Sequence, residues 1–279
     1  RSQSMGRAVV GLARRAIRLR RTFTTISEEA SWPGLSPGFA VDKFGQKGRG
    51  IRAVNGAKRG DVVVDLEPIV VLQRDIEMGL NADPMLGNAE VSELVQLCKS
   101  EGIRFPAMVL LMASQSLLYE QGFDAYWTRV YRLNHATIAD EMHPVYMRCH
   151  MFTMQALFSI YSEKKLEEFL SATYTARWFA RTLNTLHINA MRCPETKDTV
   201  LFETGSMFNH SCNPNVIVEW EVSENQVTRA KFRTIRDVGE GEECTISYVH
   251  PSVSQKEREN TLGFGYGIHC RTKCDCKLD

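Results

Sequence analysis

The stretch SMFNHSCNPN (residues 206–215) crowds turn-forming and polar side chains between two apolar stretches. Ser and Asn side chains bond to nearby backbone groups, and Pro fixes its own φ, so such a run favours turns over regular structure. We therefore predict a kinked loop with many local side-chain hydrogen bonds. His210 and Cys212 within it are potential metal ligands, although a single His-x-Cys pair is usually structural.

A second informative stretch, GEGEECTISY (residues 239–248), lies downstream. Its glycines predict a turn that leads into a short strand ending at Tyr248. Taken alone, Tyr248 is typical of a half-buried strand aromatic. Near the other end of the chain, Lys47-Gly48-Arg49-Gly50 allows a tight turn and close approach of the backbone to a ligand, although an ordinary turn between strands is the more common use of such glycines.

Strand-like segments precede residue 75 and return after residue 200, with helical periodicity between them. The predicted strands are Phe39 to Phe44, Ile51 to Val54, Val62 to Leu72, Val216 to Val222 and Val227 to Ile235, the last two joined by a Ser223-Glu224-Asn225 turn. The predicted long helices are Val145 to Tyr161 and Leu166 to Leu186. This split order implies that both ends of the chain build one site.

In their order and spacing, these motifs resemble the SET methyltransferase signature. The matching stretches are Asn-His-Ser-Cys-x-Pro-Asn (Asn209 to Asn215), Gly-Glu-Glu-x-Thr-Ile-Ser-Tyr (Gly241 to Tyr248) and the Gly-x-Gly at Gly48 to Gly50. The spacing of Arg258, Leu262, Tyr266, Ile268 and Cys270 resembles the family's linker into its post-SET region. Ile188-Asn189-Ala190 resembles the SMYD (SET-and-MYND) branch. The resemblance covers roughly residues 38–276.

The resemblance implies an α+β fold of short β-sheets with a pseudoknot-like C-terminal loop, a large helical insert (SET-I) and a small cysteine-rich post-SET tail. It divides the chain into a basic targeting or disordered segment (1–31), an N-terminal SET half (38–74), a helical insert (75–188), a C-terminal SET half (189–250) and a post-SET region (251–279). A MYND finger is not expected in the insert, because residues 51–200 contain no Cys-x-x-Cys pair.

The activity that the resemblance implies is transfer of a methyl group from S-adenosylmethionine to the ε-amine of a lysine in a protein, histone or non-histone. Tyr248 matches the family's catalytic tyrosine. A phenol suits that place because in-line displacement by a neutral amine depends mainly on alignment. The lysine, with an ordinary pKa of about 10.4, must first lose a proton, which desolvation and the nearby sulfonium favour. The alternative is a catalytically silent SET-fold protein-interaction module.

The resemblance also implies which residues contact S-adenosylmethionine. Asn209 and His210 match those that hold its adenine and amino groups, and Lys47, Gly48 and Arg49 match those that line its methionine end. The full set of expected cofactor contacts is Lys47, Gly48, Arg49, Gly50, Asn189, Ser206, Asn209, His210, Tyr248 and Tyr266. Ile268 stands where SMYD-type proteins usually have Phe, so adenine packing is expected to be weaker.

Four cysteines correspond to the post-SET zinc site: Cys212, Cys270, Cys274 and Cys276. Four thiolates satisfy tetrahedral zinc and would tie the tail to the active site. The spacing departs from the family, since Cys-x-x-x-Cys-x-Cys replaces Cys-x-Cys-x-x-Cys and Thr272 stands where a cysteine is expected. The alternative is a set of reduced cysteines on a flexible tail. The isolated Cys98, Cys149 and Cys193 are expected to pack in cores.

Charge is distributed unevenly along the chain. Residues 1–27 hold seven arginines and no acid, which leaves 27 basic against 33 acidic residues elsewhere. An acidic body favours basic partners such as lysine-rich protein tails over nucleic acid, and no apolar run reaches the roughly 20 residues of a membrane span. We expect a monomer.

The arginine-rich segment resembles a mitochondrial transit peptide, and the alternative is a disordered basic tail. We therefore expect an intracellular location, in the nucleus, cytoplasm or mitochondrion.

Overall fold

The structure is a computed structural model of the 279-residue chain. It describes residues 31–74, 144–160, 175–250 and 252–269, with short pieces at 96, 100, 108–109, 111–112 and 129–133. The predicted N-terminal basic segment up to residue 30 and the cysteines of the tail lie outside the described residues. The chain divides into two compact units, one containing Leu72–His187 and the other Trp32–Val71 and Ile188–Asp279.

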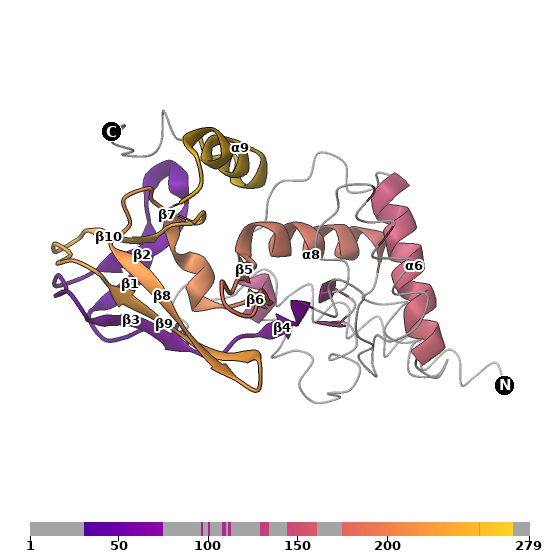
Figure 1. The fold of residues 1–279 in the computed structure, drawn as a ribbon, viewed down its shortest axis with the longest axis horizontal. Helices are drawn as coiled ribbons and strands as arrows, with labels where there is room; N and C mark the ends of the chain where they lie inside the picture. The colour runs from indigo at the N-terminus through magenta and orange to yellow at the C-terminus, as the bar shows by residue number, and fades with distance from the viewer. Residues whose placement is uncertain are drawn as a thin grey trace, which may run out of the picture. The chain divides into compact units, whose positions relative to one another are not determined.

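The described residues form three small sheets (Figure 1). The four-stranded sheet has the order β1-β2-β10-β7, with β1 at Phe39–Lys43, β2 at Arg49–Ala53, β10 at Glu243–Ile246 and β7 at Asn209–His210. Its β10–β7 pair is parallel and sets Thr245 opposite Asn209 and Ile246 opposite His210. The two motif stretches of the sequence therefore lie on neighbouring strands.

A three-stranded antiparallel sheet has the order β3-β9-β8, with β3 at Val62–Leu66, β9 at Gln226–Thr234 and β8 at Val216–Ser223. Glu224 and Asn225 join β8 to β9 with φ of 51° and 61°. Two successive positive φ values match the right-handed twist of a hairpin. The predicted hairpin is confirmed, and its buried side carries Ala230 and Phe232, both 0% exposed.

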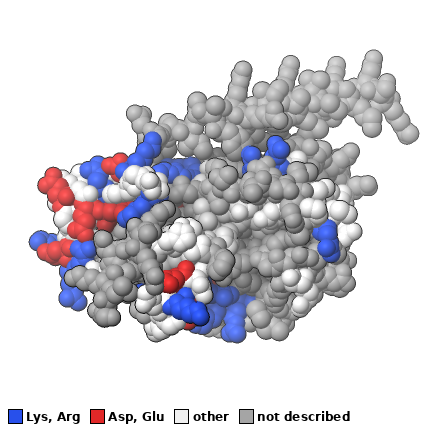
Figure 2. All heavy atoms as spheres, turned by 90° about the horizontal axis from the view of Figure 1, so that it is seen from above, with Lys and Arg blue, Asp and Glu red and all other residues white. Residues whose placement is uncertain are grey.

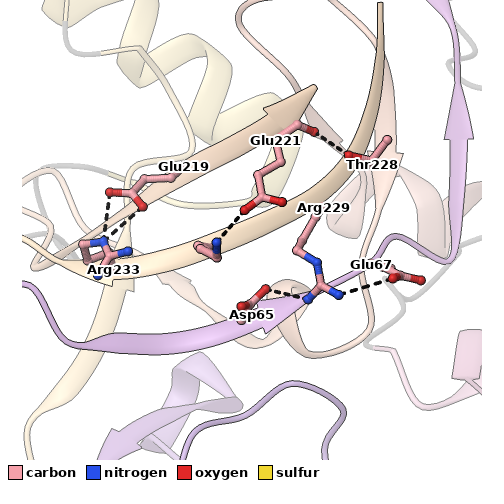
Figure 3. Close-up of polar contacts among 8 residues, drawn as sticks. Asp65, Glu67, Glu219, Glu221, Thr228, Arg229 and Arg233 are labelled. Carbon is pink, nitrogen blue, oxygen red and sulfur yellow. Dashed lines mark hydrogen bonds and ion pairs between the residues drawn. The ribbon is translucent and has the colours of Figure 1, made fainter. Parts of the chain in front are cut away.

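The opposite side of β9 carries a ladder of ion pairs, in which each base of β9 meets an acid of a neighbouring strand (Figure 3). The pairs are Arg229–Asp65, Lys231–Glu221 and Arg233–Glu219. Solvent-exposed pairs of this kind contribute little to stability, because water and salt screen the charges. Figure 2 also shows acidic and basic side chains next to one another on the face that it draws. Much of the acidity of this sheet is therefore neutralised locally, which weakens the inference from net charge to a basic partner.

The segment from Val62 to Leu72, predicted as one strand, is two strands in different sheets. β3 ends at Leu66, and β4 (Val70–Leu72) belongs to a sheet of order β4-β6-β5 with β6 at Thr199–Leu201 and β5 at Met191–Arg192. The break contains Pro68, which lacks the N–H that a continuing strand would donate. Ile69 resumes the pairing by donating to the Leu201 carbonyl at 2.7 Å.

The described helices of the insert are α6 (Pro144–Ile160) and α8 (Ala176–Asn189). The helix predicted at Val145 to Tyr161 is confirmed. The single helix predicted at Leu166 to Leu186 is wrong at Thr175, which is not helical and whose hydroxyl accepts from the Trp178 backbone at 3.1 Å, so α8 begins at Ala176; it continues three residues beyond Leu186. Residues 161–174 lie outside the described part. Cys149 and Cys193 are 0% exposed, as expected for core residues. No helix among the described residues is long and apolar enough to cross a membrane.

Helix α9 (Gln255–Tyr266) follows the last strand. Ser254 caps its start by accepting a hydrogen bond from the Glu257 backbone at 3.3 Å, and Gly267, with φ of 64°, ends it. A left-handed residue at this place satisfies the last carbonyls of a helix. The four-residue spacing of Leu262 and Tyr266 noted in the sequence is therefore helical, and Leu262 is fully buried.

Candidate active site

We call residues 208–215, which contain His210, the histidine loop. Its last residue, Asn215, ties the loop to β10. Its Oδ1 accepts from the Thr245 backbone at 2.7 Å, and its Nδ2 donates to the Glu243 carbonyl at 2.8 Å and to Glu242 Oε1 at 3.2 Å. The residue is 1% exposed. Ser211 adds a backbone bond to the Ile246 carbonyl. The loop is thereby fixed against the strand that leads to Tyr248.

The side chain of Tyr248 is held by the loop on two sides. Its hydroxyl donates to the Phe208 carbonyl at 2.7 Å, and its backbone N–H donates to His210 Nδ1 at 3.1 Å. Phe208 is 1% exposed and stacks on Phe232 with ring centroids 4.6 Å apart, so the accepting carbonyl is fixed. Burial, followed by Tyr266 and Glu243, raises the pKa of Tyr248 well above its ordinary value. The phenol is therefore neutral at physiological pH.

His210 links the loop to Tyr248 through its ring. Because Nδ1 accepts from Tyr248, the ring proton of the neutral form lies on Nε2, which is 3.2 Å from Cys212 Sγ. Burial lowers the pKa of His210 to about 4, and the positive charges of Arg258 and Lys47 act in the same direction. At neutral pH this imidazole is uncharged and serves as a hydrogen-bonding support.

Tyr266 reaches the site from the last turn of α9. Its ring lies 4.7 Å from that of Tyr248, centroid to centroid, at an interplanar angle of 49°. The His210 ring lies 5.3 Å from the Tyr248 ring, centroid to centroid. The structure thus brings together three of the predicted site residues: His210 from β7, Tyr248 from the segment after β10, and Tyr266 from α9. The rings of His210 and Tyr266 both lie beside the Tyr248 phenol.

Gly48 and Gly50 of the Lys47–Gly50 stretch are each required to be glycine, for different structural reasons. Gly48 has φ 79° and ψ −141°, a combination that side-chain-bearing residues rarely adopt. A Cβ on Gly50 would lie 2.7 Å from Asn209 Nδ2 and 2.7 Å from the ring of Phe44. Gly48 thus allows the turn, and Gly50 allows β2 to approach Asn209 closely.

Asn209 is the point where this stretch meets the histidine loop. Its Nδ2 donates to the Arg49 carbonyl at 3.1 Å and to Glu243 Oε1 at 2.7 Å, while Glu243 Oε2 accepts from Lys47 Nζ at 2.6 Å. The guanidinium of Arg49 lies over the Trp32 ring, 5.6 Å from its centroid. Sequence reasoning missed Glu243. The available signal was a second acid at the start of a strand whose next three residues are apolar or buried.

Ser206 and Asn189 also meet in the structure. Ser206 lies in the 3-10 turn η2 (Thr204–Met207) that leads into the histidine loop, and its hydroxyl lies within bonding distance of the Phe202 carbonyl and 3.3 Å from the Asn189 carbonyl. Asn189, at the end of α8, is 4% exposed. The structure therefore brings the pair together, and the cofactor contacts expected of their side chains remain predictions.

Comparison with known protein families identifies the domain that contains this site: residues 48–249 match the SET domain. The chain belongs to the SET domain family. The expected fold class, an α+β SET fold of short sheets and helices, is thereby confirmed. The matched range runs from the glycine turn to the residue after Tyr248, so it contains the histidine loop, β10 and the phenol described above.

The chain is similar to several known proteins. Histone-lysine N-methyltransferase SET5 of Candida albicans is 35% identical over 120 residues, which is 42% of this chain and 24% of the relative. A SET and MYND domain-containing protein of Dictyostelium discoideum is 36% identical over 81 residues, 29% of this chain and 15% of the relative. The solved SET domain of LSMT bound to lysine and AdoHcy superposes with a TM-score of 0.46 at 12% identity, over 93% of this chain and 57% of that one. The chain spans less than a quarter of the length of either curated relative.

The zinc ligands expected of this SET domain are represented in the structure by Cys212 alone. Cys270, Cys274 and Cys276 lie outside the described residues, among which no group of three or more potential ligands gathers. Cys212 is partly exposed at the loop surface, with its sulfur beside His210 Nε2.

Proposed function

We propose that this SET domain transfers methyl groups from S-adenosylmethionine to a lysine side chain of a protein. The observation that carries the proposal is the state of Tyr248: a neutral, partly buried phenol whose proton is directed at the Phe208 carbonyl. Its oxygen lone pairs are then left to accept an N–H of an incoming amine. Alignment of that kind is what displacement by a neutral amine requires.

The residues near Gly48 fit the proposed cofactor. Lys47 and Arg49 supply cations suited to the carboxylate of a methionine moiety. Apart from its two chain neighbours, no described residue has an atom within 4 Å of where a Gly48 Cβ would stand, so these residues leave the backbone there open to a ligand. The bound cofactor would supply the methyl group on a sulfonium. Tyr248 would orient the amine, and the neutral His210 would hold the Tyr248 backbone without adding a positive charge beside the sulfonium.

We further propose that the domain is of the SMYD type, with no MYND finger between residues 51 and 200. The Ile188-Asn189-Ala190 match and the Dictyostelium relative support this subclass. The name of the Candida relative supports a histone tail as one candidate among lysine-containing substrates. The chain would act as a monomer inside the cell, and the arginines of residues 1–27 support the mitochondrion as one candidate compartment.

Cofactor binding tests the proposal directly. A ligand that binds the native state at about 100 times its Kd stabilises it by about 2.7 kcal/mol, which raises the Tm of a domain this size by roughly 5–10 °C. We expect this shift with S-adenosylmethionine or S-adenosylhomocysteine, and no shift with ATP as an adenine-containing control. An unchanged Tm with saturating S-adenosyl compounds would leave the silent interaction module as the better description.

We also propose that Cys212 and the tail cysteines bind one structural zinc. Elemental analysis should find about one zinc per chain, because four thiolates complete a tetrahedral site. Cys212→Ser should lower that content and destabilise the site, since structural zinc contributes folding free energy. Cys193→Ser is the matched control: this thiol is buried in the core and should leave the zinc content unchanged. A metal-free preparation with full methyl-transfer activity would refute the zinc proposal.

A further inference from the structure

Glu243 joins three segments that are distant in the sequence. It lies on β10, 34 residues from Asn209 and 196 residues from Lys47 along the chain. One carboxylate oxygen accepts from Asn209 Nδ2 at 2.7 Å, and the other accepts from Lys47 Nζ at 2.6 Å. The Glu243 side chain is 11% exposed, compared with 44% for Lys47. The carboxylate is therefore the inner partner of both contacts.

The surroundings of this carboxylate leave it little room. A Cβ on Gly50 would lie 2.8 Å from Glu243 Oε1, so β2 passes close beside the acid. The backbone of Glu243 is fixed as well, because its carbonyl accepts from Asn215 Nδ2. Hydrogen bonds to an ionised carboxylate are stronger than neutral ones. The acid is thus held in place by its surroundings and can fix the positions of the Lys47 ammonium, which is more exposed, and of the Asn209 amide.

We propose that Glu243 is a positioning residue that holds the Lys47 ammonium and the Asn209 amide in place for the cofactor. The inference rests on the proposed function, in which Lys47 and Asn209 contact S-adenosylmethionine. Without the carboxylate, the Lys47 side chain returns to solvent on its flexible stem. Asn209 then keeps only the longer bond to the Arg49 carbonyl.

The loss should fall on cofactor binding rather than on the methyl-transfer step. Tyr248 is held by the Phe208 carbonyl and by His210, and neither of these bonds involves the Glu243 side chain. An interaction that binds the cofactor equally in the ground and transition states changes KM and leaves kcat in place. A merely structural glutamate would lower the Tm without this division between KM and kcat.

Glu243→Gln tests the proposal with little change of shape. Loss of charge-assisted bonds of this kind should raise the Kd of S-adenosylhomocysteine, measured by calorimetry, about 10-fold. At saturating S-adenosylmethionine, kcat should stay within about twofold of wild type, because only uniform binding is lost. The Tm without cofactor should remain near that of wild type. Glu240→Gln removes an exposed acid three residues away and should bind as wild type does.

The outcomes separate this inference from the function on which it rests. Wild-type protein that does not bind S-adenosylhomocysteine contradicts the proposed function itself. Wild-type binding with an unchanged Kd in Glu243→Gln overturns the role of Glu243 alone. Repeating the substitution in a Lys47→Met background should give a smaller loss, and an undiminished loss would overturn the route through Lys47. If Glu243→Gln does not fold, Glu243→Asp decides: it keeps the charge on a shorter side chain, and wild-type binding by it also overturns the role.

Discussion

Tyr248→Phe is expected to slow methyl transfer by about 100-fold or more, because misplacing a reacting group by about 1 Å has effects of this size. The phenylalanine fills the same space, but the bond from the hydroxyl to the Phe208 carbonyl is lost, together with the oxygen that would accept from the amine. The rate is measured as transfer of labelled methyl groups from S-adenosylmethionine to proteins of a cell extract. Mass spectrometry of the labelled proteins then identifies the substrate.

Tyr131→Phe provides the matched control. The Tyr131 hydroxyl accepts a hydrogen bond from Trp178 Nε1 at 2.8 Å, and burial raises its pKa to about 12, so it too is a partly buried, hydrogen-bonded phenol. Its loss should lower stability by about 1 kcal/mol and leave the transfer rate unchanged. A Tyr248→Phe protein that transfers methyl groups at the wild-type rate would remove this phenol from the proposed mechanism.

The fold was most predictable where a local pattern determines it. Alternation of apolar and polar residues and an Asn-containing turn were sufficient to predict the β8–β9 hairpin, because a two-residue turn and a half-buried sheet leave local signals. The segment from Val62 to Leu72 was predicted incorrectly because its apolar run suggested one strand. Pro68 marked the break, but nothing local shows that β3 and β4 pair with partners more than a hundred residues away.

The candidate site was predictable in its motif residues and not in their connections. The resemblance named Asn209, Lys47 and Tyr266. The structure places Asn209 and Lys47 on the Glu243 carboxylate and the Tyr266 ring beside Tyr248, while their contacts with the cofactor stay predictions. The matched Gly-Glu-Glu stretch contains Glu243, but the resemblance gave this acid no role, because its bonds depend on a parallel β7–β10 pairing that no local pattern specifies. The role of Phe208 was also missed, because it depends on the backbone carbonyl, which every residue type has.

Asn215→Leu is expected to destabilise the domain by about 3 kcal/mol, because each buried group left unpaired costs roughly 1–3 kcal/mol. Leucine has the same γ-branched shape as asparagine, but it is larger and cannot form hydrogen bonds. The substitution leaves the Thr245 N–H and the Glu243 carbonyl without the Asn215 amide at a site that is 1% exposed. The free energy of unfolding is measured by urea denaturation.

Asn213→Leu is the control that separates the loss of the Asn215 side-chain bonds, which clamp the loop to β10, from the general effect of placing an apolar residue in this loop. Asn213 lies two residues away and is exposed, so its substitution should change the free energy of unfolding by less than about 0.5 kcal/mol. Because Asn215 fixes the strand that leads to Tyr248, the weakened clamp should also lower the transfer rate at temperatures where the domain is still folded. Equal unfolding free energies for the two leucine variants would mean that the β7–β10 ladder, rather than this buried amide, holds the histidine loop against the catalytic segment.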